Sequence, residues 1–149
     1  MDRRHELVHA EEQGWAELVG LLEGLSPAQL EEPGLSPDGW SVKDLMFHVG
    51  CWSADCAHVL ERIRMGTFEE PEIDIDAVNR EWFEVSRTLD LATVRAELMS
   101  GRNRMLQEWA ALEEITLEAD SWFEESGPIH YADHAGDLRR WVERLTSGG

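Results

Sequence analysis

Apolar residues recur along this chain at spacings of three and four, which is the period of an α-helix. No segment shows convincing strand alternation; Glu114–Glu118 is the only candidate strand, and it is short. The predicted helices run from Asp2 to Gly24, from Ser41 to about Met65, from about Asp74 or Asp76 to Ser86, from Leu91 to about Leu112, and from just after Gly127 to near Leu145. Four long amphipathic helices plus a shorter one predict an all-α four-helix bundle.

Two boundaries and one connection complete this prediction. Ser41 is predicted to cap the second helix, with Asp44 completing a capping box. Pro128 is predicted to lie in the first turn of the last helix, where its missing N–H costs nothing. The polar stretch from Glu113 to Gly127 is predicted to be the connection into that helix.

The size and charge of the chain limit its partners. With 149 residues we expect one domain over 1–149, large enough to bury a core. No apolar run approaches the ~20 residues of a membrane span, and the N-terminus lacks a signal-peptide core, so we expect a cytoplasmic protein. A formal charge of −18 argues against nucleic acid and against anionic membranes as partners.

The last predicted helix carries two histidines on its apolar face. His130 and His134 are four residues apart, about 40° around the helix axis, and Leu138 and Trp141 continue the same face. Both imidazoles therefore point inward, where they need partners, and a metal ion can satisfy two side by side. Such a site requires at least a third ligand from elsewhere in the chain.

The second helix offers that ligand. His48 lies about 60° from the centre of its apolar stripe, at the edge of the buried face, whereas His58 lies about 140° away and should face solvent. Three neutral imidazoles are the number that a catalytic zinc-type site uses while one position stays open. His48, His130 and His134 are therefore the predicted metal ligands, although packed and hydrogen-bonded histidines without a metal are an alternative.

The two cysteines are predicted to be structural. Cys51 and Cys56 are five residues apart in one helix and lie on different faces, which disfavours a local disulfide. We expect buried free thiols, with a part as third metal ligand as the alternative.

Two further residues of the last helix are candidate catalytic helpers. Tyr131 occupies the position at which the metalloprotease helix carries its general base, so zinc-protease chemistry is not expected. Asp137 shares the inward face with the histidines and could orient one of them, or pair with an arginine such as Arg140 or Arg104.

Two segments together resemble a known family. Gly39–Trp52 is similar to the second-helix signature of the DinB-like/YfiT-like superfamily, and His130-Tyr131-Ala132-Asp133-His134 resembles its last-helix signature. The resemblance implies an up-down-down-up bundle, frequently dimeric, with a divalent metal held by His48, His130 and His134. The last-helix pattern looks closest to the ClbS/DfsB-like and mycothiol-transferase-like branches. Relatives there include thiol-dependent transferases and isomerases, which use mycothiol, bacillithiol or glutathione, and hydrolase-like self-resistance proteins.

These observations lead to two functional hypotheses and a simpler third. The first is an enzyme that uses a divalent metal, zinc or nickel, to add a low-molecular-weight thiol or water to a small electrophile, in detoxification or self-resistance. An acidic surface disfavours an anionic cosubstrate such as glutathione unless the pocket is positive. The second is a non-catalytic dimeric bundle that sequesters a hydrophobic molecule, with Trp40, Trp52 and Trp109 as candidate lining residues. The third is a structural or interaction domain.

Overall fold

The computed structural model describes residues 2–148, and within this range it contains helices and no β-strand. Met1 and Gly149, the ends of the predicted domain, lie outside the described residues. The elements are α1 (Arg3–Glu23), α2 (Pro27–Glu31), α3 (Val42–Met65), α4 (Ile75–Ser86), α5 (Leu91–Ala111), α6 (Leu117–Glu124), a π-helical turn η1 (Glu125–Ile129) and α7 (His130–Ser147).

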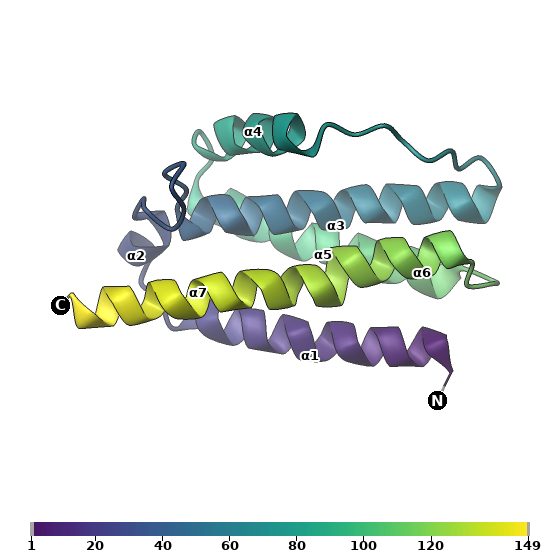
Figure 1. Ribbon diagram of the computed structural model, residues 1–149, viewed down its shortest axis with the longest axis horizontal. Coiled ribbons are helices and arrows are strands. Elements are labelled where there is room, and N and C mark those ends of the chain that lie inside the picture. Colours follow the sequence, from purple (N-terminus) through teal and green to yellow (C-terminus); the bar gives the residue numbers. More distant parts are fainter. Residues whose placement is uncertain (1, 149) are drawn as a thin grey trace.

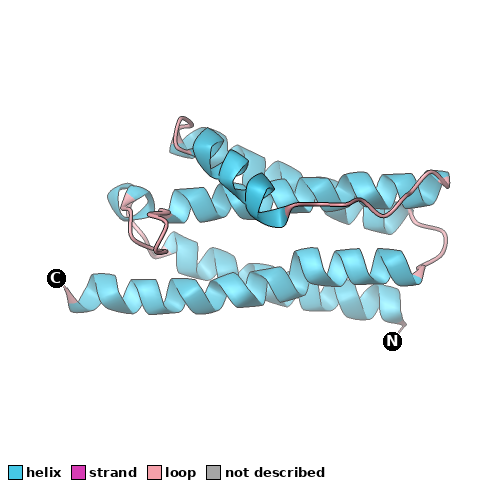
Figure 2. Ribbon diagram, turned by 45° about the horizontal axis from the view of Figure 1, so that its top comes forward, coloured by secondary structure: helices cyan, strands magenta, loops and turns pink. Residues whose placement is uncertain are grey.

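The four long helices form a bundle in which α1 and α7 run in one direction and α3 and α5 in the other (Figure 1). Because α3 and α5 are parallel, the chain must return along the bundle between them. It does so through an extended segment that lies outside the bundle and leads into α4 (Figure 2). The predicted all-α, up-down-down-up four-helix bundle with a short extra helix is confirmed.

Local capping chemistry fixes the two ends of α3. Ser41 Oγ accepts the Asp44 N–H at 3.2 Å, and the Asp44 carboxylate accepts the Ser41 N–H at 2.7 Å, which is the predicted capping box. Gly66 ends the helix in the left-handed conformation with φ of 74°, which glycine adopts without a steric penalty. The predicted boundaries of this helix are therefore confirmed.

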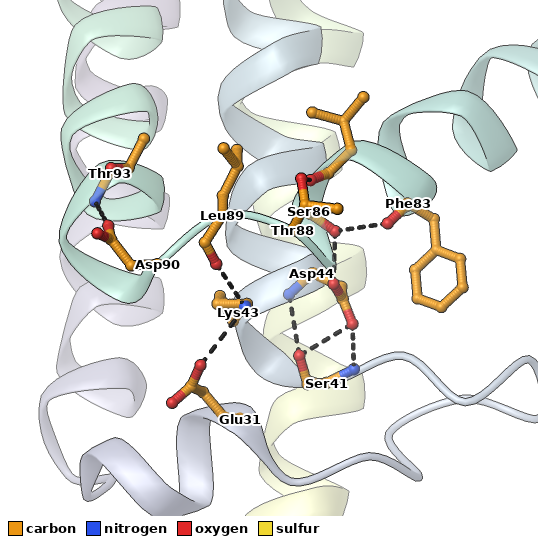
Figure 3. Close-up of polar contacts among 11 residues, drawn as sticks. Glu31, Ser41, Lys43, Asp44, Phe83, Ser86, Thr88, Leu89, Asp90 and Thr93 are labelled. Carbon is orange, nitrogen blue, oxygen red and sulfur yellow. Dashed lines mark hydrogen bonds and ion pairs between the residues drawn. The ribbon is translucent and has the colours of Figure 1, made fainter.

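A buried polar cluster joins the start of α3 to the segments around it. The Asp44 carboxylate also accepts a hydrogen bond from Ser86 Oγ at the end of α4, and the neighbouring Lys43 Nζ donates to the carbonyl oxygen of Leu89 at 2.7 Å (Figure 3). These contacts hold the C-terminal end of α4 against the first turn of α3, one turn before His48.

The parallel helices α3 and α5 touch through their backbones. A Cβ atom built on Gly101 would lie 2.3 Å from the carbonyl oxygen of Gly50, and one built on Gly50 would lie 2.9 Å from the Cα of Leu98. Any side chain at either glycine would force the helices apart. This contact sets the separation of α3 and α5, and with it the depth of the core.

The start of the last helix differs from the prediction. Helical structure begins at Leu117 and continues without a break through η1 to Ser147, so the proposed connection over 113–127 is wrong from Leu117 onward. The segment 114–118 forms no strand, in agreement with its unconvincing alternation. Thr116 caps α6 by accepting the Ala119 N–H, and Phe123 is fully buried against Trp109. The buried residues Ala119 and Phe123, four apart in sequence, anchor α6 even though acidic residues surround them.

Pro128 therefore lies inside a helix and not at its start. The residue falls within the π-helical turn, where the hydrogen-bond ladder is locally widened. Since proline has no N–H to donate, such a turn accommodates it with less disruption than a regular α-helical register would. His130 follows directly as the first residue of α7.

None of the helices within residues 2–148 is both long enough and apolar enough to span a bilayer.

Candidate metal centre

Three histidines from α3 and α7 converge in the interior of the bundle. His130 Nε2 lies 2.9 Å from His48 Nε2 and 2.9 Å from His134 Nε2. The candidate ligand atoms of all three lie within 4.8 Å of one another. The structure therefore brings together the three residues that helix geometry and the family resemblance both selected.

All three imidazoles are held neutral by their surroundings. Burial, followed by the neighbouring His134, lowers the pKa of His48 to about 3. Burial and the two other rings lower the pKa of His130 to about 2. Burial also lowers the pKa of His134, an effect that the carboxylate of Asp137 opposes. A neutral imidazole has one ring nitrogen with a free lone pair, which is the form that binds metals.

The three side chains fit a divalent cation. Nitrogen–metal bonds of about 2.0–2.1 Å in tetrahedral geometry put two ligand nitrogens about 3.3 Å apart, so shifts of about 0.4 Å would open the cluster around an ion. In addition, His130 Nε2 faces the Nε2 atoms of both other rings, and a hydrogen bond between two such nitrogens needs a proton on one of them. His130 Nε2 carries either one proton or one lone pair, so it cannot form both of these contacts as full hydrogen bonds, and a cation bound by the Nε2 lone pairs would relieve that deficit.

Asp137 lies beside the cluster and contacts both predicted kinds of partner. Its Oδ2 is 3.5 Å from His134 Nδ1, and its Oδ1 accepts a hydrogen bond from Arg140 Nη2 at 2.6 Å. Its side chain is 48% exposed, so it lies at the margin of the site and not inside it. Arg140, and not Arg104, is thus the arginine that it meets.

Tyr131 belongs to a second buried cluster. Its hydroxyl donates to Glu11 Oε2 at 2.9 Å and makes no hydrogen bond to the three imidazoles. Arg102 from α5 donates to both oxygens of the Glu11 carboxylate, at 2.7 and 2.8 Å, and its guanidinium lies over the ring of Trp15. The cluster ties α1, α5 and α7 together directly beside His130.

Aromatic side chains support His48 from the side of α4. The ring of Trp40 meets the His48 ring edge-on at a centroid distance of 5.2 Å and stacks on Phe83 at 5.6 Å. One turn further along α3, Trp52 donates its indole N–H to Asn79 Oδ1 at 3.0 Å. Through Phe83 and Asn79, α4 therefore holds the α3 side of the cluster in place.

A cavity of about 750 Å³ opens beside the histidines, between α3, the segment that leads into α4, and α6. His48 and His130 both line it, together with Trp52 and Trp122. This is a volume suited to a small organic molecule. A cation at the cluster would therefore lie next to a space that a substrate could occupy.

The cavity includes residues that the sequence did not predict. Trp52 was expected to line a pocket and does so, whereas Trp109 is a core residue that is 1% exposed and stacked on Phe123. Trp122 was missed because its segment was interpreted as a connection. The i, i+4 pair of Ala119 and Phe123 beside it could have revealed the helix.

The remaining histidine and cysteine predictions concern residues outside the cluster. His58 is exposed, as expected. Both cysteines are free thiols; Cys56 is fully buried, whereas Cys51 is only partly buried. Neither belongs to the group of potential ligand atoms around His48.

Comparisons with known proteins agree with this architecture. The sequence model of the mycothiol maleylpyruvate isomerase N-terminal domain matches residues 12–145. No curated protein has a sequence that matches this chain.

Two solved structures share the fold. An uncharacterised protein from Escherichia coli UTI89 is 17% identical with a TM-score of 0.82, and the alignment covers 96% of this chain and 94% of that chain. The colibactin self-resistance protein ClbS, solved in complex with double-stranded DNA, is 15% identical with a TM-score of 0.79 over 93% of this chain and 94% of that chain. Because the family match spans most of the sequence and the fold agrees with it, the chain belongs to the mycothiol maleylpyruvate isomerase N-terminal domain family, within the DinB/YfiT-like superfamily.

Proposed function

We propose that this protein is a divalent-metal-dependent enzyme that adds a thiol or water to a small electrophilic molecule, in detoxification or self-resistance. The observation that carries the proposal is the convergence of three neutral imidazoles at the edge of a cavity. Zinc and nickel both suit an all-imidazole ligand set. When bound, such a cation would lower the pKa of a coordinated thiol or water and so supply a nucleophile near neutral pH.

The chain's own residues would then have separate tasks. His48, His130 and His134 would hold the cation, with the cavity on the side of His48 and His130. Asp137 would orient His134 through its Nδ1 atom, as carboxylates beside ligand histidines commonly do. Tyr131 would act indirectly, by fixing the first turn of α7 to the buried Glu11.

The family and the similar structures support the class of activity. The family is that of a mycothiol-dependent isomerase domain, and ClbS is a self-resistance protein. The ClbS structure contains DNA, but the charge of −18 on this chain supports a small-molecule target here.

Metal content tests the proposal directly. We expect about one divalent ion per chain in the purified protein by mass spectrometry, lost in His48→Ala and His134→Ala. His58→Ala is the matched control, because it removes an exposed histidine from the same helix as His48. Retained metal should be accompanied by thiol transfer or hydrolysis on panels of electrophiles. A wild-type protein that takes up no metal after reconstitution contradicts the proposal.

The alternative is a non-catalytic bundle that sequesters a hydrophobic molecule. It is favoured by the cavity and by the apolar side chains at its edge, since Leu117 is 88% exposed and Ile75 is 56% exposed. A sequestering bundle needs no metal. This alternative would be supported if the protein showed no activity and bound its ligand equally well with and without metal.

We further propose that the protein is a homodimer, as the family resemblance implies. Light scattering at several protein concentrations tests this: a mass of twice 17.0 kDa supports it, and a mass of 17.0 kDa contradicts it.

A further inference from the structure

We infer that the cavity beside the histidines binds a cationic amphipathic molecule, meaning an apolar or aromatic body that carries an ammonium or guanidinium group. This inference rests on the proposed function in one respect, since it treats the occupant of the cavity as the substrate. It goes beyond that function by stating the charge and the polarity of the substrate.

The charged residues that line the cavity are all acidic. Glu70 comes from the segment before α4, Glu118 from the first turn of α6, and Glu125 from the π-helical turn. No arginine or lysine lines the cavity. A cavity bordered by carboxylates alone attracts cations and repels anions.

These three carboxylates also have no ion-pair partner among the residues that the structure describes. None forms an ion pair within residues 2–148, whereas Glu11, Glu17 and Glu124 each pair with an arginine. An unpaired carboxylate at the edge of a cavity keeps its full charge available to a bound molecule. Because the three come from two segments far apart in sequence, it is the fold that gathers them around one space.

The rest of the lining is suited to an apolar body. Trp52 and Trp122 present indole rings to the cavity, and Ile75 and Leu117 leave most of their side chains exposed beside them. A bound apolar group would cover this surface and remove it from water. The indole rings would also attract a cation through their π faces.

The buried end of the cavity fixes how such a molecule would lie. His48 is 7% exposed, lines the cavity, and has an Nδ1 atom with no hydrogen-bond partner among the described residues. The reacting group of the substrate would therefore lie at the histidines, and its positive charge at the glutamates of the edge. On this arrangement the carboxylates at the edge disfavour an anionic cosubstrate such as glutathione relative to a neutral thiol.

Three probes of similar shape and different charge test the inference: naphthylmethylamine, naphthylmethanol and naphthoate. Binding is measured by titration calorimetry on the chelator-treated full-length protein, at low and at high salt. We expect the amine to bind most tightly and the carboxylate least, with a ratio of about tenfold or more at low salt that shrinks at high salt. Trp52→Ala should weaken the binding of both the amine and the alcohol.

A pair of double variants separates local from global charge. Glu118→Gln/Glu125→Gln should weaken amine binding about threefold or more and leave the alcohol unchanged. Glu23→Gln/Glu113→Gln removes the same charge from exposed glutamates that do not line the cavity, and should change neither.

Several results would overturn the inference. The inference is wrong if the amine and the carboxylate bind equally tightly, if the two double variants have equal effects, or if Trp52→Ala leaves probe binding unchanged. Absence of binding by the amine would do the same. Because the protein is metal-free in these titrations, their outcome is independent of the metal assay, and either proposal can fail while the other stands.

Discussion

Replacing Arg102 with methionine is expected to destabilise the protein by about 3–5 kcal/mol, because it leaves a buried carboxylate without its counter-ion. The Glu11 side chain is 0% exposed, and Arg102 supplies two of its three hydrogen bonds. After the substitution only the Tyr131 hydroxyl remains as a donor. The side chain of Arg102 is itself only 16% exposed, so water replaces it poorly.

Two further variants separate the loss of a hydrogen bond from the loss of the counter-ion. Tyr131→Phe removes one hydrogen bond to a charged group and leaves the ion pair intact, so its cost should be about 1.5–3 kcal/mol. The double variant Glu11→Leu/Arg102→Met removes both charges together. It should be less destabilising than Arg102→Met alone, because no unpaired charge is then buried.

Urea unfolding followed by tryptophan fluorescence measures all three variants. For a chain of 149 residues, 3–5 kcal/mol corresponds to a fall in melting temperature of about 10 °C. A cost below about 1 kcal/mol for Arg102→Met would refute the reasoning. So would a double variant that is at least as destabilising as Arg102→Met alone.

Three other perturbations have defined outcomes. Gly101→Ala should destabilise the protein by about 3 kcal/mol or more, because its Cβ would lie 2.3 Å from the Gly50 carbonyl oxygen. Gly20→Ala is the control: it has open space around it in α1 and should stabilise the protein by up to about 1 kcal/mol. Urea unfolding measures both changes. Burial raises the pKa of the Cys51 and Cys56 thiols to about 12, so both should react with Ellman's reagent at pH 8 at least about a hundredfold more slowly in native than in unfolded protein. The three site histidines have pKa values in the folded protein that lie below the value in the unfolded chain, so the stability that they contribute is present above about pH 6.5 and is lost as the pH falls. Metal-free protein should therefore lose about 2–4 kcal/mol of stability between pH 7 and pH 5, as measured by urea unfolding. An unchanged stability would contradict the burial of these rings in the neutral form.

Much of the fold could be predicted because its signals are local. A serine or aspartate followed three residues later by a suitable partner identifies a helix start, as at Ser41 and Asp44, and Gly66 marks a helix end. The histidine set could be predicted for the same reason. Spacing along a helix determines which side chains share a face, and His48, His130 and His134 each fall on or beside an apolar one.

Local signals failed where the tertiary structure overrides them. Acidic residues made 113–127 resemble a connection and Pro128 resembled a helix start. The burial of Phe123 against Trp109 nevertheless holds α6 in helical form, and a π-helical turn accommodates the proline. Helix propensity is a weak local preference, and a buried aromatic pair outweighs it.

The sequence by itself determined most of the helices, the capping box of α3 and the three inward-facing imidazoles, since each depends on residues within a few turns of one another. Only the tertiary structure decided how far apart the helices lie and what surrounds the histidines. The contact between Gly50 and Gly101, the bonding of Tyr131 to Glu11 across 120 residues, and the cavity shared by Trp52 and Trp122 all join segments remote in sequence. Their physical cause is close packing, which depends on the complementary shapes of side chains from different helices and has no period along the chain.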